Sequence, residues 1–312
     1  MSCVLVTGAS GFLGQALSRR LRAHGYLVTA LSRHTPAVSE EPWLQVQSYE
    51  ESAHLLAGQD CVVHLAARVH IMNDAVQDPL DEFRVANVDL TLRLAQQAAH
   101  VGVRRFVFIS SVKVNGEEAA SEQPFLADDE PEPQDPYGIS KMEAEQALRS
   151  LAVQTGMEVV IIRPPLIYGP GVRANFEALI RVIARGVPLP LGAIQNQRSL
   201  VALDNLVDLI SICVNHPLAA NQTFMVSDGE DMSTPDLIRR IAKAMDRPVR
   251  LFSVPLWLLR MGANIMGKAS ALQRLCGNLQ VDISKTKNTL GWTPPVSVDE
   301  GLRRAVAQWR KQ

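Results

Sequence analysis

The chain begins Met1-Ser-Cys-Val-Leu-Val-Thr-Gly-Ala-Ser-Gly-Phe-Leu-Gly14, and this stretch decides the fold. The apolar run at 3–6 predicts a strand buried on both faces, and the apolar positions after the glycines open a helix. Gly8 permits a tight turn, Gly11 lets a pyrophosphate approach bare backbone, and Gly14 lets helix and strand pack closely. The stretch therefore predicts a dinucleotide site at a helix N-terminus. The alternative is a glycine-rich turn that binds no ligand.

The composition indicates a globular protein without a nucleic-acid partner. The 312 residues are 47% hydrophobic and carry a net charge of −1, so no overall positive field attracts nucleic acid. The four cysteines have neither Cys-x-x-Cys nor zinc-type spacing, which predicts free thiols, no metal site and a cytoplasmic protein. No signal peptide is expected, because the apolar run of the first strand is too short for one. No transmembrane segment is expected either, because Arg260, Gly262 and Asn264 interrupt the apolar stretch 254–266. That stretch predicts a cap helix, with an interfacial role as the alternative.

The order of the apolar segments predicts a doubly wound parallel α/β sheet with helices on both faces. Strands are expected at 3–6, 26–32, 43–46, 60–67, 105–109, 159–162, 199–203 and 224–226, with helices between them at 12–24, 50–57, 79–101, 142–156, 176–185 and 205–215. Asp204 is expected to cap the last of these helices. A rigid, turn-rich segment at 163–171 marks a change of domain. We expect a dinucleotide-binding domain of residues 1–168, to which 199–226 return, and a smaller substrate domain of residues 169–198 and 227–312.

The end of the second strand carries Ser32-Arg33-His34, where a dinucleotide fold places the adenosine ribose. An acidic residue here would bond the ribose hydroxyls and repel a 2′-phosphate. Arg33 instead predicts a 2′-phosphate, so NADP(H) is expected over NAD(H), unless Arg33 is simply an exposed loop residue. Ala66 and Ala67 end the strand at 60–67, and small residues there let a ligand come close.

A second cluster combines Ser110-Ser111, after the strand at 105–109, with Tyr137 and Lys141. Positions i and i+4 lie on one face of a helix, so both side chains can reach one substrate. A free tyrosine has a pKa near 10, and a neighbouring ammonium is expected to lower that pKa. Tyr137 can then exchange a proton with an alcohol, while Ser111 bonds the same oxygen.

The polar connection 116–136 holds eight acidic residues and no basic one. A loop of this length is often functional, although a solvated surface loop is an equal alternative. Lys113 precedes it. Its ammonium could contact a substrate diphosphate or an acidic residue of the pocket, or it could be a surface lysine beside the acidic loop.

With these motifs the sequence resembles the extended short-chain dehydrogenase/reductases that act on nucleotide sugars. The matching residues are Thr7-Gly8-x-x-Gly11-x-x-Gly14, Asp60-x-x-x-His64-x-Ala66-Ala67, Asn87, Ser110-Ser111, Tyr137-x-x-x-Lys141, Arg163-Pro164, Tyr168-Gly169-Pro170, Arg198 to Asp204, and Asp282-x-Ser284-Lys285. The resemblance implies a catalytic triad of Ser111, Tyr137 and Lys141. It implies cofactor contacts at Thr7, Gly8, Ser10, Gly11, Phe12, Leu13, Gly14, Ser32, Arg33, His34, Leu65, Ala66, Ala67, Asn87, Tyr137, Lys141 and Pro164. It implies substrate contacts at Ser111, Lys113, Arg173, Asn175, Arg198 and Arg274. Of these, Arg198 and Arg274 are expected to bind the diphosphate of a UDP-sugar.

Departures from the family pattern refine this expectation. Dehydratases of the family carry an Asp-Glu pair after the catalytic Ser/Thr, whereas Val112-Lys113 follow Ser111 here, so dehydration is excluded. Four-epimerases usually carry an acid where this chain has Arg33. The segment 110–116 is similar to a bacterial branch that includes 4-ketoreductases of UDP-2-acetamido-2,6-dideoxy sugars in O-antigen pathways. The expected function is therefore NADP(H)-dependent reduction at C4 of a UDP-linked keto sugar.

Two alternatives remain open. A UDP-hexose or UDP-N-acetylhexosamine 4-epimerase with tightly bound NAD would use the same residues. A non-catalytic nucleotide-sensing module would keep the glycine loop and lose the chemistry. The resemblance also implies a homodimer formed by the helices at 80–101 and 137–156.

Overall fold

The computed structural model describes residues 2–33, 43–47, 53–68, 79–119, 123–267 and 269–311. Its centre is a seven-stranded, wholly parallel sheet in the order β3-β2-β1-β4-β5-β6-β9. The strands are β1 (Cys3–Thr7), β2 (Leu27–Ser32), β3 (Leu44–Gln45), β4 (Cys61–His64), β5 (Arg105–Ile109), β6 (Glu158–Arg163) and β9 (Thr223–Met225). The order reverses direction at β1, as in doubly wound dinucleotide-binding folds, which confirms the predicted fold class.

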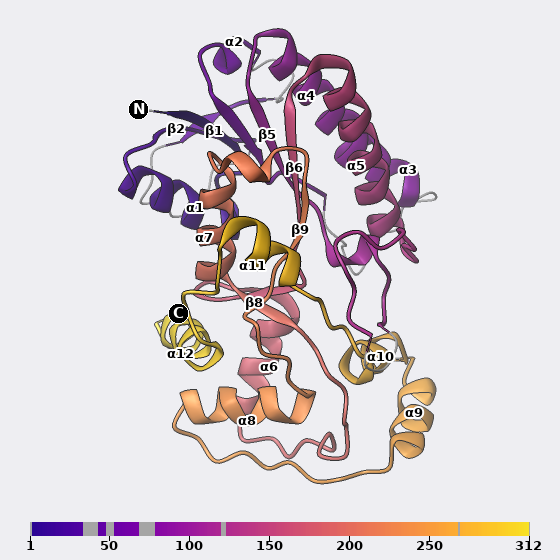
Figure 1. The fold of residues 1–312 in the computed structure, drawn as a ribbon. Helices are drawn as coiled ribbons and strands as arrows, with labels where there is room; N and C mark the ends of the chain where they lie inside the picture. Colours follow the sequence, from indigo (N-terminus) through magenta and orange to yellow (C-terminus); the bar gives the residue numbers. More distant parts are fainter. Residues whose placement is uncertain are drawn as a thin grey trace.

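Helices cover both faces of this sheet (Figure 1), and the strands accordingly contribute apolar residues to the core on each face. One face packs against α1 (Phe12–Ala23), α7 (Leu203–Cys213) and α11 (Ser284–Leu290), and the other against α2 (Ala53–Leu56), α4 (Leu90–His100) and α5 (Pro136–Thr155). The helix expected at 79–101 is divided into α3 (Pro79–Arg84), a π-helical turn (Val85–Asp89) and α4. A π turn inside a helix often marks a functional position.

The remaining elements form a second body with its own apolar core. They are β7 (Leu166–Tyr168), β8 (Leu200–Ala202), α6 (Ala174–Ala184), α8 (Thr234–Ala244), α9 (Leu256–Ile265), α10 (Ala269–Cys276) and α12 (Val298–Trp309). Two short 3-10 helices, η3 (Val112–Val114) and η4 (Pro217–Ala219), lie in the sheet part. The strand expected at 199–203 pairs with β7 in a separate two-stranded sheet rather than in the main sheet. The division into a dinucleotide domain and a substrate domain stays a prediction.

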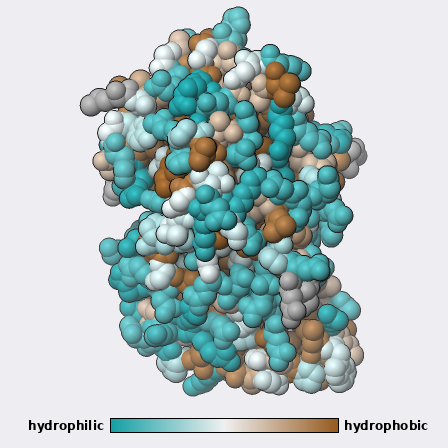
Figure 2. Space-filling view, in the orientation of Figure 1, coloured by the Kyte–Doolittle hydropathy of each residue, from teal (hydrophilic) through white to brown (hydrophobic). Residues whose placement is uncertain are grey.

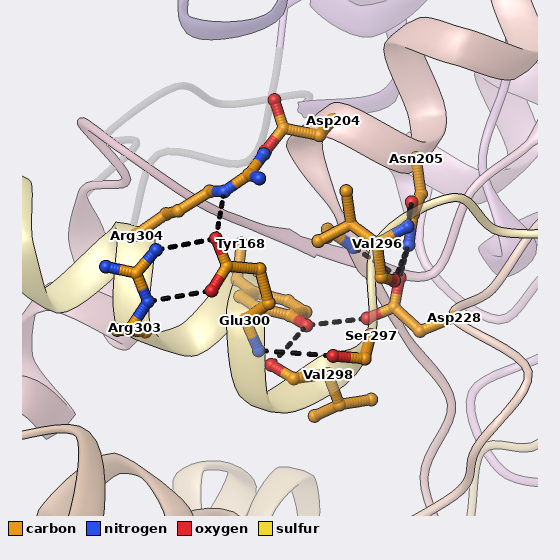
Figure 3. A network of polar contacts seen from close by, with 11 residues as sticks. Tyr168, Asp204, Asn205, Asp228, Val296, Ser297, Val298, Glu300, Arg303 and Arg304 are labelled. Atoms are coloured by element: carbon orange, nitrogen blue, oxygen red, sulfur yellow. Dashed lines mark hydrogen bonds and ion pairs between the residues drawn. The ribbon is translucent and has the colours of Figure 1, made fainter.

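A polar network anchors α12 to the elements that lead out of the main sheet (Figure 3). The Tyr168 hydroxyl donates to Asp228 at 2.6 Å, and the same carboxylate accepts from the Asn205 amide at 2.7 Å. The predicted cap at Asp204 is wrong, because α7 already begins at Leu203 and has no side-chain cap. The Asp204 carboxylate instead accepts from Arg304 of α12 at 2.8 Å.

The acidic connection 116–136 pairs with the C-terminal part of the chain. Ala119 N–H donates to Asn278 O at 3.0 Å, Phe125 N–H to Gln280 O at 2.9 Å, and Asp282 N–H to Phe125 O at 3.0 Å. The loop that follows the Ser110-Ser111 pair is therefore joined to the body that contains Arg198. These backbone hydrogen bonds give the acidic connection a structural role.

All four cysteines are free, as expected. Within the described ranges, no helix has the length and apolar character that crossing a bilayer requires. The same ranges contain no cluster of three or more His, Cys, Asp or Glu side chains suited to a metal ion.

Candidate active site

The predicted site residues gather where β1, β4 and β5 end. Thr7, His64 and Phe108 lie side by side in the register of these strands, so the loops after them open at one edge of the sheet. Ligands of open α/β sheets bind at this edge, next to the point where the strand order reverses.

The glycine loop leaves backbone where other residues would place side chains. Gly8 has φ +69°, and a Cβ there would lie 2.9 Å from the Ala66 backbone nitrogen. A Cβ on Gly14 would overlap the Gly8 carbonyl oxygen. Gly11 is exposed at the N-terminus of α1, where free backbone N–H groups favour an anion. This cradle fits the pyrophosphate of a dinucleotide, with Phe12 and Leu13 in the first turn of α1 behind it.

His64 fixes the floor of the loop. Its Nδ1 lies 2.8 Å from Thr7 Oγ1, and its Nε2 lies 3.0 Å from Thr91 Oγ1. Burial, together with the positive charges of Lys141 and Arg33, lowers the pKa of His64 to about 3. The ring is therefore neutral at physiological pH and serves as a structural bridge between Thr7 and Thr91.

The end of β2 lies against the glycine loop through a 2.5 Å hydrogen bond between Ser10 Oγ and Ser32 Oγ. Arg33, the next residue, is exposed, and its positive charge acts on His64. His34 lies outside the described residues. Leu65, Ala66 and Ala67 are half-buried after β4, on the other side of the Gly8 turn.

Tyr137 and Lys141 share one face of α5, as predicted. Lys141 Nζ donates to Ile109 O at 2.8 Å, and it lies 4.4 Å from the Phe108 ring centroid and 6.0 Å from that of Tyr137. The lysine is thus fixed on β5, two residues before Ser111. The structure thus places Lys141 next to Tyr137 and against the end of the strand that leads to Ser111.

Burial changes the protonation of this pair. It lowers the pKa of Lys141 to about 7, although the Glu145 carboxylate opposes that change. It also raises the pKa of Tyr137 above its ordinary value, and the negative charge of Asp135 raises that pKa further. The expectation that Lys141 lowers the pKa of Tyr137 is therefore wrong for this structure, because the ammonium is directed to a backbone carbonyl and desolvation outweighs it. Tyr137 holds its proton at neutral pH.

An ion pair links the two segments that carry the predicted catalytic residues. Lys113 Nζ donates to Glu117 at 2.7 Å and to the Asp135 carboxylate. The other Asp135 oxygen accepts from Gly138 N–H at 2.6 Å and so caps α5. The pair joins the turn after Ser111 to the first turn of the helix that carries Tyr137. These contacts favour the interpretation of Lys113 as a partner of the acidic loop.

A buried network lies directly behind the site. Arg163 forms two hydrogen bonds with Glu145, at 2.9 and 2.6 Å, and both side chains are 2% exposed. Ser110 donates to the same carboxylate at 2.6 Å, and Arg163 also donates to Asn115 at 3.0 Å. Glu145 follows Lys141 by one helical turn. The network thus fixes the ends of β5 and β6 relative to α5.

Asn87, in the π-helical turn, is bonded to the protein. Its Oδ1 accepts from Arg68 N–H at 2.8 Å, while its Nδ2 donates to Arg68 O at 3.1 Å and to Ser140 Oγ at 3.0 Å. Ser140 in turn donates to Tyr137 O at 2.8 Å. Asn87 therefore connects the loop after β4 to the helix that carries Tyr137, and its contact with the cofactor stays a prediction.

The predicted substrate residues are more widely spread. Arg198 donates to Gly277 O at 2.9 Å, and burial lowers its pKa, against the charges of Glu117 and Glu118. Arg173 and Asn175 are exposed on either side of Ala174, which has φ +57°. An alanine in the left-handed region is strained, and such strain often marks a binding site.

Two further predicted site residues are Pro164, for the cofactor, and Arg274, for the substrate. Pro164 is buried, and its carbonyl accepts from Val112 N–H at 3.0 Å, next to Ser111. Arg274 lies in α10, but its side chain is outside the described residues.

Sequence reasoning missed Asp135, Glu145 and Ser140 as residues that position the site. The Asp135-Pro136 pair directly before Tyr137 was a usable signal, because Asp at the cap followed by Pro at the first position is typical of a helix start. Glu145 continues the four-residue spacing of Tyr137 and Lys141.

Residues 4–227 match the model of the NAD dependent epimerase/dehydratase family. The chain belongs to this family. It is 46% identical over 308 residues to a UDP-glucose 4-epimerase of Vibrio cholerae, covering 97% of this chain and 94% of that protein. Among solved structures, MoeE5 in complex with UDP-glucose and NAD has a TM-score of 0.79 at 25% identity and 99% coverage of each chain. RMD from Pseudomonas aeruginosa, complexed with NADPH, has a TM-score of 0.75 at 23% identity and 100% coverage of each.

The resemblance to extended short-chain dehydrogenase/reductases is thereby confirmed. The protein is an NAD(P)-dependent nucleotide-sugar oxidoreductase or epimerase of that family. The pyrophosphate of a nicotinamide cofactor fits the glycine loop at the N-terminus of α1.

Proposed function

We propose that the protein is a UDP-hexose or UDP-N-acetylhexosamine 4-epimerase. The observation that carries the proposal is the placement of Tyr137 beside Lys141 on α5, with Lys141 fixed on the β5 carbonyl just before Ser110-Ser111. The relative at 46% identity, named as a UDP-glucose 4-epimerase, supports epimerisation over the C4 reduction that the sequence favoured.

The roles of the residues follow from their positions. A bound nicotinamide supplies or accepts the hydride at C4 of the sugar. Tyr137 exchanges the proton of the C4 oxygen, Ser111 donates a hydrogen bond to that oxygen, and Lys141 bonds the ribose of the cofactor. Arg198, Arg173 and Asn175 hold the diphosphate and the sugar. Epimerisation uses the same proton transfer twice, once in each direction, with the sugar turned between the two steps.

A second candidate function is NADPH-dependent reduction of a UDP-linked 4-keto-6-deoxy sugar. Arg33 favours it, because the end of β2 offers a guanidinium beside the Ser10–Ser32 contact and Ser32-Arg33-His34 has no carboxylate. The protonated state of Tyr137 favours it also, since reduction needs a proton donor. In this case the cytoplasmic synthesis of O-antigen precursors is the expected setting. The homodimer remains a proposal for either function.

One paired assay separates the two. The purified protein is incubated with UDP-glucose or UDP-N-acetylglucosamine and NAD, and the C4 epimers are separated by chromatography. A parallel sample receives a UDP-4-keto-6-deoxy sugar and NADPH, and nicotinamide absorbance is followed. Interconversion of epimers without net change of cofactor supports the epimerase. Stoichiometric NADPH oxidation with no epimerisation assigns the reductase instead. If neither sample reacts although the protein binds nucleotide, the non-catalytic alternative is supported. The presence of Ser111, Tyr137 and Lys141 argues against that alternative.

A further inference from the structure

Helix α9 turns its large apolar side chains toward water. Trp257, Met261 and Ile265 are 64%, 51% and 80% exposed. They are four residues apart and therefore share one helical face. Ala263 is buried and lies roughly opposite that face. The helix thus packs on the protein through a small residue and presents its bulky ones outward.

The exposed apolar surface extends beyond these three residues. Phe252, Leu256, Leu258, Met266 and Leu275 are also at least partly exposed large apolar residues of the same segment. Figure 2 shows brown side chains at the lower right of the molecule, where Figure 1 places α9. Apolar residues scattered singly need no explanation, but a cluster on one helix marks an interaction surface.

Basic residues lie within this apolar segment and next to it in the sequence. Residues 247–281 contain five basic residues and no acidic one, in a chain of net charge −1. Arg250 and Arg260 are exposed, and in the described ranges neither of them lies within ion-pair distance of a carboxylate. Elsewhere, exposed arginines such as Arg239 and Arg303 are paired within their own helices. The chemistry of the segment therefore calls for an apolar, anionic partner.

We propose that α9 and its flanking basic segment dock on the surface of an anionic lipid bilayer. A helix with aromatic and aliphatic side chains on one side and arginines beside them lies in the plane of the interface, and tryptophan prefers that depth. Since α9 has ten residues, it lies along the bilayer and does not cross it.

A second copy of this chain explains the charge less well. In a two-fold interface each arginine would approach the arginines of its partner, and like charges oppose association. The proposal does not depend on which nucleotide-sugar reaction the active site performs.

Flotation of the full-length protein with lipid vesicles tests the proposal. Vesicles of phosphatidylethanolamine and phosphatidylglycerol are compared with vesicles of phosphatidylcholine, at low and high salt. We expect binding to the anionic vesicles that weakens with salt. Trp257→Ser combined with Ile265→Ser should weaken it at least about tenfold through lost apolar burial. Arg250→Ser or Arg260→Ser should each weaken it about fivefold, on anionic vesicles only.

Leu218→Ser is the matched control, because Leu218 is 61% exposed in η4, outside this surface, and its loss should leave flotation unchanged. Unchanged circular dichroism and unchanged turnover of a water-soluble sugar nucleotide exclude misfolding of the variants. The proposal is overturned if the protein does not float with anionic vesicles, or if the Trp257/Ile265 variant floats like the wild type. The proposal is also overturned if the protein forms a dimer without vesicles and Trp257→Ser abolishes that dimer, because the surface would then belong to an interface with a second copy.

Discussion

The buried Glu145–Arg163 pair predicts a large loss of stability when either partner is removed alone. Each side chain is 2% exposed and the two form two short hydrogen bonds, so Glu145→Gln leaves an uncompensated guanidinium in the protein interior. Removal of one partner of such a pair costs about 3–5 kcal/mol. Ser110 loses its charged acceptor as well. That loss is a large share of the roughly 5–15 kcal/mol by which a protein is stable.

Urea unfolding followed by circular dichroism measures the effect. Glu145→Gln and Arg163→Met should each lower the midpoint without a change of slope. The double variant Glu145→Gln/Arg163→Met should lose less than the sum of the single losses, because no buried charge is left without a partner. Arg239→Ala, at an exposed pair with Asp236, is the control and should cost at most about 1 kcal/mol. A loss below about 1 kcal/mol for Glu145→Gln, or full additivity in the double variant, would refute the reasoning.

Three further predictions concern the site. Tyr137→Phe should keep nucleotide binding, measured by fluorescence quenching, and lose about two to four orders of magnitude in rate; normal turnover would assign the proton to another group. Arg33→Asp should shift the ratio of kcat/KM for NADPH over NADH by around ten- to several-hundred-fold towards NADH, through loss of one or two charge-assisted bonds; an unchanged ratio would remove Arg33 from the cofactor site. The pKa of His64 is lowered from 6.5 to about 3, so only the unfolded state takes up this proton between those values. The free energy of unfolding should therefore fall on acidification across that range, by up to about 4 kcal/mol, and His64→Gln should flatten the pH profile measured by urea titration.

The sequence predicted those features that depend on neighbouring residues. The β1–α1 unit was readable because strand, glycine turn and helix follow one another directly. Tyr137 and Lys141 could be placed on one face because helical spacing is fixed. Features that depend on residues far apart in the sequence could not be predicted. The bonds of Asn87 join residues 19 and 53 positions away, and the raised pKa of Tyr137 depends on burial that only the packed site creates.

The late position of β9 in the chain has a consequence for synthesis on the ribosome. Thr223, its first residue, is made 60 residues after Arg163, the last of β6, and β9 is the strand that covers this side of the sheet. Until then the nascent chain exposes the backbone N–H and C=O groups of β6, which are a template for pairing with another chain. A fragment that ends near residue 168 would keep this open edge permanently and should aggregate. The match to the family model ends at residue 227, directly after β9, which is the earliest point at which the sheet can be complete.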